Sequence, residues 1–176
     1  IIAIVPLSGG SNINLMRAES PGPSVGKLVP KVKHTARILY IIYLGLSLTE
    51  FIILLLAKMP VFDAMNTTFG TAGTGGFGIK NSSLGGYSVT IQWIVTVFMI
   101  LFGVNFNAYY LMLFGSIKKA LTMEEVRAYF GIILTSIVII SINIYSMCSG
   151  VWDAITKSAF QVGSIITTTG FSTIDF

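Results

Sequence analysis

Two short runs of glycine and threonine are the residues of this sequence whose types and spacing could do chemistry. Glycine accepts backbone angles that are barred to other residues, so such a run can turn its carbonyl oxygens to one side. Carbonyl oxygens that replace the hydration shell of an ion are a known source of potassium selectivity. We therefore expect the two runs to be filter strands of a cation pore. The strands are formed by Gly73, Thr74, Gly75, Gly76, Thr167, Thr168, Thr169 and Gly170.

Each run closes a short segment, and the two segments open in the same way. An aspartate between an aromatic residue and an alanine begins each one, Asp63 in the first and Asp153 in the second. Asp63 precedes Gly76 by 13 residues and Asp153 precedes Gly170 by 17, so the second segment is longer by about one helical turn. An aspartate that caps a helix complements its positive end. We expect two copies of one unit, in which a short capped helix directs its negative end at the glycine-threonine run.

The composition excludes an ordinary soluble domain. Of 176 residues, 53% are hydrophobic and only 10% are charged, against roughly 25% charged residues in soluble domains. A single cysteine, Cys148, and a single histidine, His34, leave no internal disulfide and no zinc cluster, so we expect no enzyme. The net charge of +4 comes from basic residues gathered in two stretches, so the expected partner is the lipid bilayer and not nucleic acid.

Three long apolar segments must position the two runs. Thr35–Lys58, Tyr87–Ile117 and Tyr129–Cys148 each supply the ~20 residues that cross a bilayer. We expect Tyr87–Ile117, which is longer than needed, to tilt or protrude as one helix. The segments that end in the glycine-threonine runs are too short to cross, and non-helical backbone is tolerated at membrane depth only inside protein or beside water. The sequence thus predicts an all-α membrane protein of repeated helix, pore-loop and helix units with re-entrant pore helices.

The basic residues fix an orientation and a division of the chain. Five Lys and Arg lie in the first polar stretch and three lie in the second, against three elsewhere, which places both stretches in the cytoplasm. The predicted division is the tail of a preceding transmembrane helix (1–8), a cytoplasmic loop (9–34), a complete repeat (35–117), a cytoplasmic elbow (118–128) and a partial repeat (129–176).

Several motifs together resemble the Trk/Ktr/HKT superfamily of potassium transporters, and especially the bacterial TrkH-type membrane subunits. They are Glu19-Ser20-Pro21-Gly22-Pro23, Lys27-Leu28-Val29-Pro30, Thr49-Glu50, Thr74-Gly75-Gly76-Phe77, Gly103-Val104-Asn105-Phe106 and Ser164-Ile165-Ile166-Thr167-Thr168-Thr169-Gly170-Phe171. The resemblance implies four such units around one ion path, of which this chain supplies the tail of the first, all of the second and the third up to its filter. It also implies potassium uptake across the cell inner (plasma) membrane by a multi-pass protein, with K+ as the transported ion and no covalently bound cofactor. A homodimer and a cytosolic nucleotide-binding regulatory subunit are further implications of the resemblance.

Four residues outside the two runs are candidates for filter support, namely Phe77, Phe171, Glu50 and Asn105. Glu50 lies within an apolar segment, where an ionisable group is costly, and either hydrogen-bonds the pore helix and filter backbone or binds the ion directly. Asn105 either faces the pore or hydrogen-bonds a neighbouring helix. Within the superfamily a filter glycine favours potassium, whereas a serine in the first loop of some plant members accompanies sodium.

Three other functions remain open from the sequence. One is a member of the same superfamily that passes both sodium and potassium. Another is a secondary transporter whose discontinuous helices form a solute site at the membrane midplane. The last is a membrane scaffold that transports nothing, which would have no use for two matching glycine-threonine runs.

Overall fold

Helices make up all the regular structure in the computed structural model, which describes residues 32–115 and 117–173. They are α2 (Val32–Leu56), α3 (Val61–Ala72), α4 (Val89–Gly103), α5 (Phe106–Phe114), α6 (Ile117–Leu121), α7 (Glu124–Ile144), a short 3₁₀ turn η2 (Tyr145–Met147) and α8 (Val151–Ile166). The predicted all-α class is confirmed for this part of the chain. The predictions for residues 1–8 and for most of the loop 9–34 fall outside the described residues.

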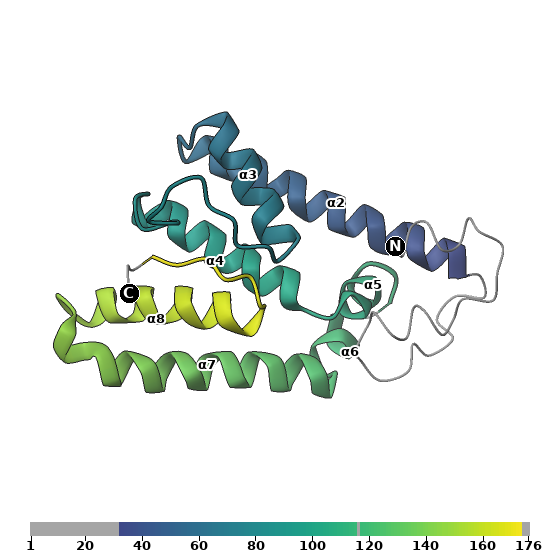
Figure 1. The fold of residues 1–176 in the computed structure, drawn as a ribbon. Helices are drawn as coiled ribbons and strands as arrows, with labels where there is room; N and C mark the ends of the chain where they lie inside the picture. Colours follow the sequence, from purple (N-terminus) through teal and green to yellow (C-terminus); the bar gives the residue numbers. More distant parts are fainter. Residues whose placement is uncertain (1–31, 116, 174–176) are drawn as a thin grey trace.

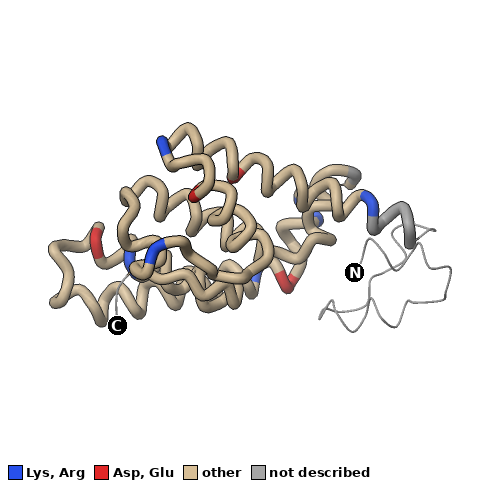
Figure 2. Tube along the Cα trace, turned by 45° about the horizontal axis from the view of Figure 1, so that its top comes forward, with Lys and Arg blue, Asp and Glu red and all other residues tan. Residues whose placement is uncertain are grey.

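Two of the described helices are long and apolar enough to cross a membrane. They span Arg37–Leu56 and Glu124–Met147, with mean hydropathies of 2.2 and 2.0. Charged residues are sparse along both, as Figure 2 shows for the whole described chain. Large apolar side chains such as Leu48 on α2 and Ile139 on α7 are more than half exposed, as expected of surfaces that meet lipid or other membrane helices.

α4 lies at the centre of the molecule, between two pairs of helices (Figure 1). It packs against α2 and α3 on one side and against α8, which pairs with α7, on the other. The short helices α3 and α8 both begin at the left of the view in Figure 1, and after each one the chain turns back toward that end. We call α2, α3 and α4 with their connections the first unit, and α7 and α8 with the following loop the second unit.

The prediction of a single long helix over Tyr87–Ile117 is wrong, because the chain bends between α4 and α5. α4 and α5 meet at an angle of 88°. Asn105 starts α5, since its side chain accepts a hydrogen bond of 2.9 Å from the backbone N–H of Asn107. This is the usual role of asparagine at a helix start, and it competes successfully with continuation of the apolar helix.

Tyrosine hydroxyls bond to backbone carbonyls in the last turn of α4, next to the bend. Tyr109 donates to the carbonyl of Leu101 at 2.7 Å, and Tyr129 of α7 donates to the carbonyl of Ile100 at 3.0 Å. Broken helices are tolerated at membrane depth when neighbouring side chains bond the freed backbone groups. The bend is therefore a stable feature that α7 helps to hold.

One apolar core joins the two units. Its fully buried side chains come from α2, from the loop that precedes α4, from α4 itself, from α8 and from the segment that follows α8. The largest of them are Leu54, Leu84, Met99, Phe160 and Phe171. Because the core is shared, the glycine-threonine loops of the two units are held at a fixed relative position.

Candidate functional site

The first glycine-threonine loop follows α3 and is bonded back to that helix. The N–H groups of Gly73 and Thr74 donate to the carbonyls of Phe69 and Thr71, at 2.9 and 3.2 Å. Those of Gly75 and Gly76 both donate to the carbonyl of Gly70, at 2.8 and 3.4 Å. Thr74 and Gly76 have left-handed backbone, with φ of 49° and 64°, whereas Gly75 between them does not.

The second loop repeats this geometry residue by residue. Thr167 and Thr168 donate to the carbonyls of Gly163 and Ile165, at 3.2 and 3.0 Å, and the next two N–H groups donate to Ser164, at 2.9 and 3.3 Å. Thr168 and Gly170 have φ of 57° and 86°. The first loop residues also match, because φ is −86° at Gly73 and −90° at Thr167. The sequence pairing of Gly76 with Gly170 therefore coincides with a structural repeat.

The difference in length between the two short helices is as predicted. α3 has 12 residues and α8 has 16, which is about one turn more. The expected N-cap position of the aspartates is wrong, however. Pro60 and Gly150 occupy the N-cap positions, and Asp63 and Asp153 are each the third residue of their helix. The carboxylates still lie at the positive ends of the helices, where negative charge is favourable.

The two loops touch each other. A side chain added at Gly76 would overlap the carbonyl group of Thr169, and its next contact would be the carbonyl carbon of Gly170 at 2.9 Å. Further along, the N–H of Leu84 donates to the carbonyl of Ser172 at 2.9 Å. The structure thus brings together two runs that lie about ninety residues apart in the sequence.

The two phenylalanines that follow Gly76 and Gly170 have opposite environments. Phe171 is 1% exposed and packs in the shared core, whereas Phe77 is 83% exposed. The ring of Phe171 lies against α3 at Gly70, where an added Cβ would come within 2.8 Å of the ring. A glycine in the short helix of the first unit therefore makes room for the second loop.

Glu50 is buried behind the first loop. Its side chain has no exposed surface and interacts with the side chain of Thr71 on α3, two residues before Gly73. Neither carboxyl oxygen has a hydrogen-bond partner in the described part of the chain. Support of the filter by Glu50 stays a prediction, with its location now known.

Asn105 lies at the bend between α4 and α5. Its side-chain amide donates to Glu125 in the first turn of α7, at 2.6 Å, in addition to starting α5. The interhelical hydrogen bond is thus the contact that the structure shows for this side chain, and its support of the filter stays a prediction.

The start of α3 is held by a tyrosine and a lysine from the loop before α4. The hydroxyl of Tyr87 donates to the carboxylate of Asp63 at 2.7 Å, and the ammonium of Lys80 lies 3.8 Å from the centre of the Tyr87 ring. Burial and, next, the hydrogen bond to Asp63 raise the pKa of Tyr87 to about 12. The phenol therefore stays a hydrogen-bond donor throughout the physiological pH range.

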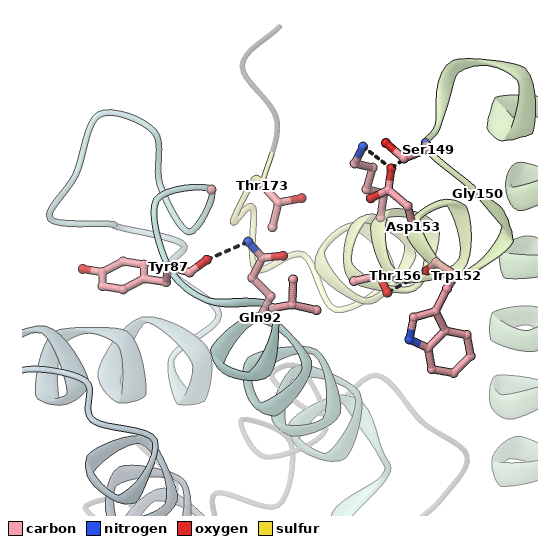
Figure 3. A pocket seen from close by; sticks show the side chains of 11 residues that line it. Tyr87, Gln92, Ser149, Gly150, Trp152, Asp153, Thr156 and Thr173 are labelled. Carbon is pink, nitrogen blue, oxygen red and sulfur yellow. Dashed lines mark hydrogen bonds and ion pairs between the residues drawn. The ribbon is translucent and has the colours of Figure 1, made fainter.

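A cleft of about 630 Å³ lies beside the start of α8 (Figure 3). Asp153 accepts from the ammonium of Lys157 at 2.8 Å and from the N–H of Ser149 at 3.2 Å. These two bonds, the one from Lys157 first, hold the pKa of Asp153 below its ordinary value, and the carboxylate in turn raises the pKa of Lys157. Thr173, just past the second loop, also lines the cleft and lies between Gln92 and Asp153 in the view of Figure 3.

Sequence reasoning missed two features of this site. The first is the junction at Gly103, where an added Cβ would come within 2.8 Å of the side chain of Thr167 and would overlap the hydroxyl of Tyr129. The bend of α4 therefore lies directly against the base of the second loop. The second is the contact between Phe171 and Gly70. Gly103 and Asn105, as helix-ending and helix-starting residue types, were the available signal for the bend, whereas no local signal marks the Phe171 contact.

The membrane-crossing helices and the paired loops define a helical membrane protein, and the comparisons name its family. A family model of cation transport proteins, TrkH, matches residues 2–176. The chain therefore belongs to the TrkH family of cation transport proteins.

Individual relatives agree with the family assignment. The chain is 34% identical to the Trk system potassium uptake protein TrkH of Salmonella typhimurium and 32% identical to that of Vibrio parahaemolyticus, over 98% and 99% of its own length. It matches the crystal structure of the potassium transporter TrkH from Vibrio parahaemolyticus with a TM-score of 0.79 and 27% identity, over 98% of this chain and 36% of that one. The chain spans 37% and 38% of the length of the two curated relatives.

Proposed function

We propose that this chain forms part of the ion path of a potassium-uptake protein in the cell inner membrane. The two glycine-threonine loops are two strands of its selectivity filter. The observation that carries the proposal is the match of the loops in hydrogen bonding and in the handedness of their backbone, together with their direct contact. The names of the relatives, which are potassium uptake proteins, support the choice of ion.

The geometry suits a dehydrated cation. Where right- and left-handed residues alternate, the N–H groups of successive peptide units point to one side of the chain and their carbonyl oxygens point to the other. In both loops the N–H groups donate to carbonyls of the preceding helix, which leaves the carbonyl oxygens of the loop residues available for an ion. These carbonyls replace the water that K+ loses on entry. The C-terminal ends of α3 and α8, each with a partial charge of about −0.5, lie at the loops and favour a cation there.

The left-handed threonines also support a functional role. A residue with a Cβ costs roughly 1–2 kcal/mol in this conformation, yet Thr74 and Thr168 both adopt it. Strain of this kind persists where the surrounding structure over-determines it, and it concentrates at functional sites. Because the same strain occurs at equivalent positions of both units, it indicates a common function of the two loops.

The remaining parts of the proposal follow from the resemblance. The complete protein has four such units around one path, with α3 and α8 entering from the outside, and it binds a second copy and a cytosolic nucleotide-binding regulatory subunit. Glu50 acts as a positioning residue behind the first loop, since its buried carboxyl group lies against the end of α3.

Potassium uptake by the complete transporter tests the proposal through Gly170→Ser. Cells that lack other potassium-uptake systems should need a higher external potassium concentration with this variant, or should admit sodium, because the serine strains the left-handed site. Gly131→Ser is the matched control, since Gly131 lies on α7 with open space around it, and it should leave uptake unchanged. Unchanged potassium affinity and selectivity in Gly170→Ser would contradict the filter assignment.

A secondary transporter is the second candidate, and the bend between α4 and α5 is the observation that favours it. Discontinuous helices form solute sites in such proteins, and Glu50 is a buried acid whose carboxyl oxygens have no hydrogen-bond partner in the described chain. This candidate predicts that Gly76 and Gly170 variants change the uptake of an organic solute. The filter proposal predicts that they change only ion flux.

A further inference from the structure

The peptide group that joins Phe171 to Ser172, just past the second loop, is held at both ends by serine hydroxyls. Its carbonyl accepts a hydrogen bond of 2.6 Å from the hydroxyl of Ser164, in the last turn of α8. Its N–H donates to the hydroxyl oxygen of Ser83, in the loop before α4, at 3.2 Å. A peptide group is planar and turns as one body, so the two bonds together fix its rotation. The two serines belong to different units.

Ser164 is well placed to hold the second loop. Its side chain is 1% exposed, and its own carbonyl accepts the N–H groups of Thr169 and Gly170 at 2.9 and 3.3 Å. Buried helical hydroxyls often donate to the carbonyl one turn back, as that of Thr167 does. Ser164 instead donates seven residues forward, to Phe171. It therefore bonds three successive residues at the outer end of the loop.

The first unit has no counterpart of this side-chain bond. A shift of 94 positions pairs Gly70 with Ser164 and Phe77 with Phe171. A Cβ added at Gly70 would lie 3.5 Å from the carbonyl oxygen of Phe77, so this position has a similar relation to its own loop but carries no hydroxyl. The ring of Phe171 lies in that space. A short helix can therefore end in such a loop without the bond, and the serine serves the second loop in particular.

The loop that carries Ser83 is anchored next to this contact. The N–H of Leu84 donates to the carbonyl of Ser172 at 2.9 Å, and the side chain of Leu84 is 1% exposed in the shared core. Ser83 itself has left-handed backbone, with φ of 49°, and its N–H donates to the carbonyl of Lys80 at 2.9 Å. Strain of this kind concentrates at functional sites, and here it accompanies a hydrogen bond to the other unit.

We propose that Ser164 and Ser83 are positioning residues that keep the carbonyl of Phe171 turned away from the ion path. The last carbonyl of the second strand that coordinates K+ is then that of Gly170. This inference rests on the proposed filter function and extends it, because it assigns the outer end of the strand and the groups that fix it. Without either serine the peptide group beside Gly170 can rotate, and a coordination site whose support is loose binds its ion less tightly.

Potassium uptake by the complete transporter tests the role of Ser164. Ser164→Ala should raise the potassium concentration for half-maximal uptake about 2- to 10-fold, the range that corresponds to one net hydrogen bond, at an unchanged maximal rate per transporter in the membrane. Ser158→Ala is the matched control and should change neither quantity. Ser158 also lies on α8 and is 1% exposed, but its hydroxyl has no hydrogen-bond partner in the described chain. An unchanged half-maximal concentration for Ser164→Ala, with or without a lower maximal rate, would overturn the proposal.

Variants of Ser83 separate the hydrogen bond from the backbone strain. Ser83→Ala and Ser83→Gly both remove the acceptor, but only glycine relieves the left-handed conformation. Both should raise the half-maximal concentration, and Ser83→Asn should lie closer to the parent, because asparagine tolerates this backbone and carries an acceptor oxygen. Ser82→Ala is the control, since the hydroxyl of Ser82 lies near Gly86 of its own loop. Opposite effects of alanine and glycine, or equal losses for all three variants, would overturn the proposal.

Two features keep the outcome decisive. Ser83 is only partly buried, so its variants answer the question even where Ser164→Ala does not reach the membrane. Gly170→Ser tests the filter assignment by itself. If Gly170→Ser changes the affinity for potassium and the serine variants do not, the positioning role fails and the filter assignment stands. If the serine variants change it and Gly170→Ser does not, the second loop is not the filter and both proposals fail.

Discussion

Substitution of Gly76 and Gly170, the two left-handed glycines of the loops, by alanine should have unequal effects. Both residues have left-handed backbone, at φ of 64° for Gly76 and 86° for Gly170, so an alanine costs about 1–2 kcal/mol at either position. An added Cβ at Gly170 meets nothing within 4 Å. The penalty there is the strain alone, which corresponds to a factor of about 5–30 in the equilibrium of the ordered loop.

The same change at Gly76 adds a collision between the loops. Its Cβ would overlap the carbonyl group of Thr169, so one loop must move relative to the other. Overpacking of this kind adds about 1–3 kcal/mol, for a total of about 2–5 kcal/mol with the strain. Gly76→Ala should therefore be clearly the more damaging of the two variants.

Thermal unfolding of the complete transporter in potassium-containing detergent solution measures this difference. Gly76→Ala should lower the unfolding midpoint more than Gly170→Ala does. Gly131→Ala should leave the midpoint unchanged or raise it, because that helical site is open and alanine is the better helix former. An equal or larger loss for Gly170→Ala would refute the reasoning, since it would mean that the loops do not touch as the structure shows.

Three further predictions concern the groups around the loops. Glu50→Ala should destabilise the complete protein by about 2–5 kcal/mol through the cavity it leaves, whereas the shape-preserving Glu50→Gln should lose less; equal losses in chemical unfolding would contradict a role based on packing. Tyr129→Phe leaves the carbonyl of Ile100 without its hydroxyl donor and should cost about 1–3 kcal/mol; an unchanged unfolding midpoint would show that the bend does not need this bond. The lowered pKa of Asp153 means that its charged form stabilises the fold above the ordinary Asp pKa of about 3.9 and that this contribution is lost as the pH falls below it. Asp153→Asn should therefore be less stable than the parent at pH 5–8 and should approach it at lower pH, and a stability difference that grows on acidification would contradict the assignment.

The membrane-crossing helices could be predicted from the sequence because length and apolar composition determine them almost alone. The positions of the two glycine-threonine loops could be predicted for a related reason, since few residue types other than glycine tolerate left-handed backbone, and Gly76 and Gly170 do adopt it. The left-handed Thr74 and Thr168 could not be predicted in this way, because nothing in a threonine side chain favours that conformation. Their backbone is determined by the helix carbonyls to which the neighbouring N–H groups are bonded.

The bend of α4 has a local signal in Gly103 and Asn105, but the residues that stabilise it lie far away in the sequence. Apolar segments lie on both sides of the bend, so composition alone favours one long helix, and the carbonyl of Ile100 is bonded by Tyr129 from another helix. The contact of Phe171 with Gly70 is likewise a long-range packing fact. The aspartates were assigned to the correct ends of the short helices but to the wrong position, because Pro60 and Gly150 begin those helices earlier.

The location of the ion itself is the most direct test of the account. Crystals of the complete transporter grown with rubidium in place of potassium would show the ion by its anomalous scattering. We expect a peak within coordination distance of carbonyl oxygens from both loops, at Gly75 or Gly76 and at Thr169 or Gly170. A well-ordered pair of loops without such a peak, with the ion bound elsewhere in the protein, would contradict it.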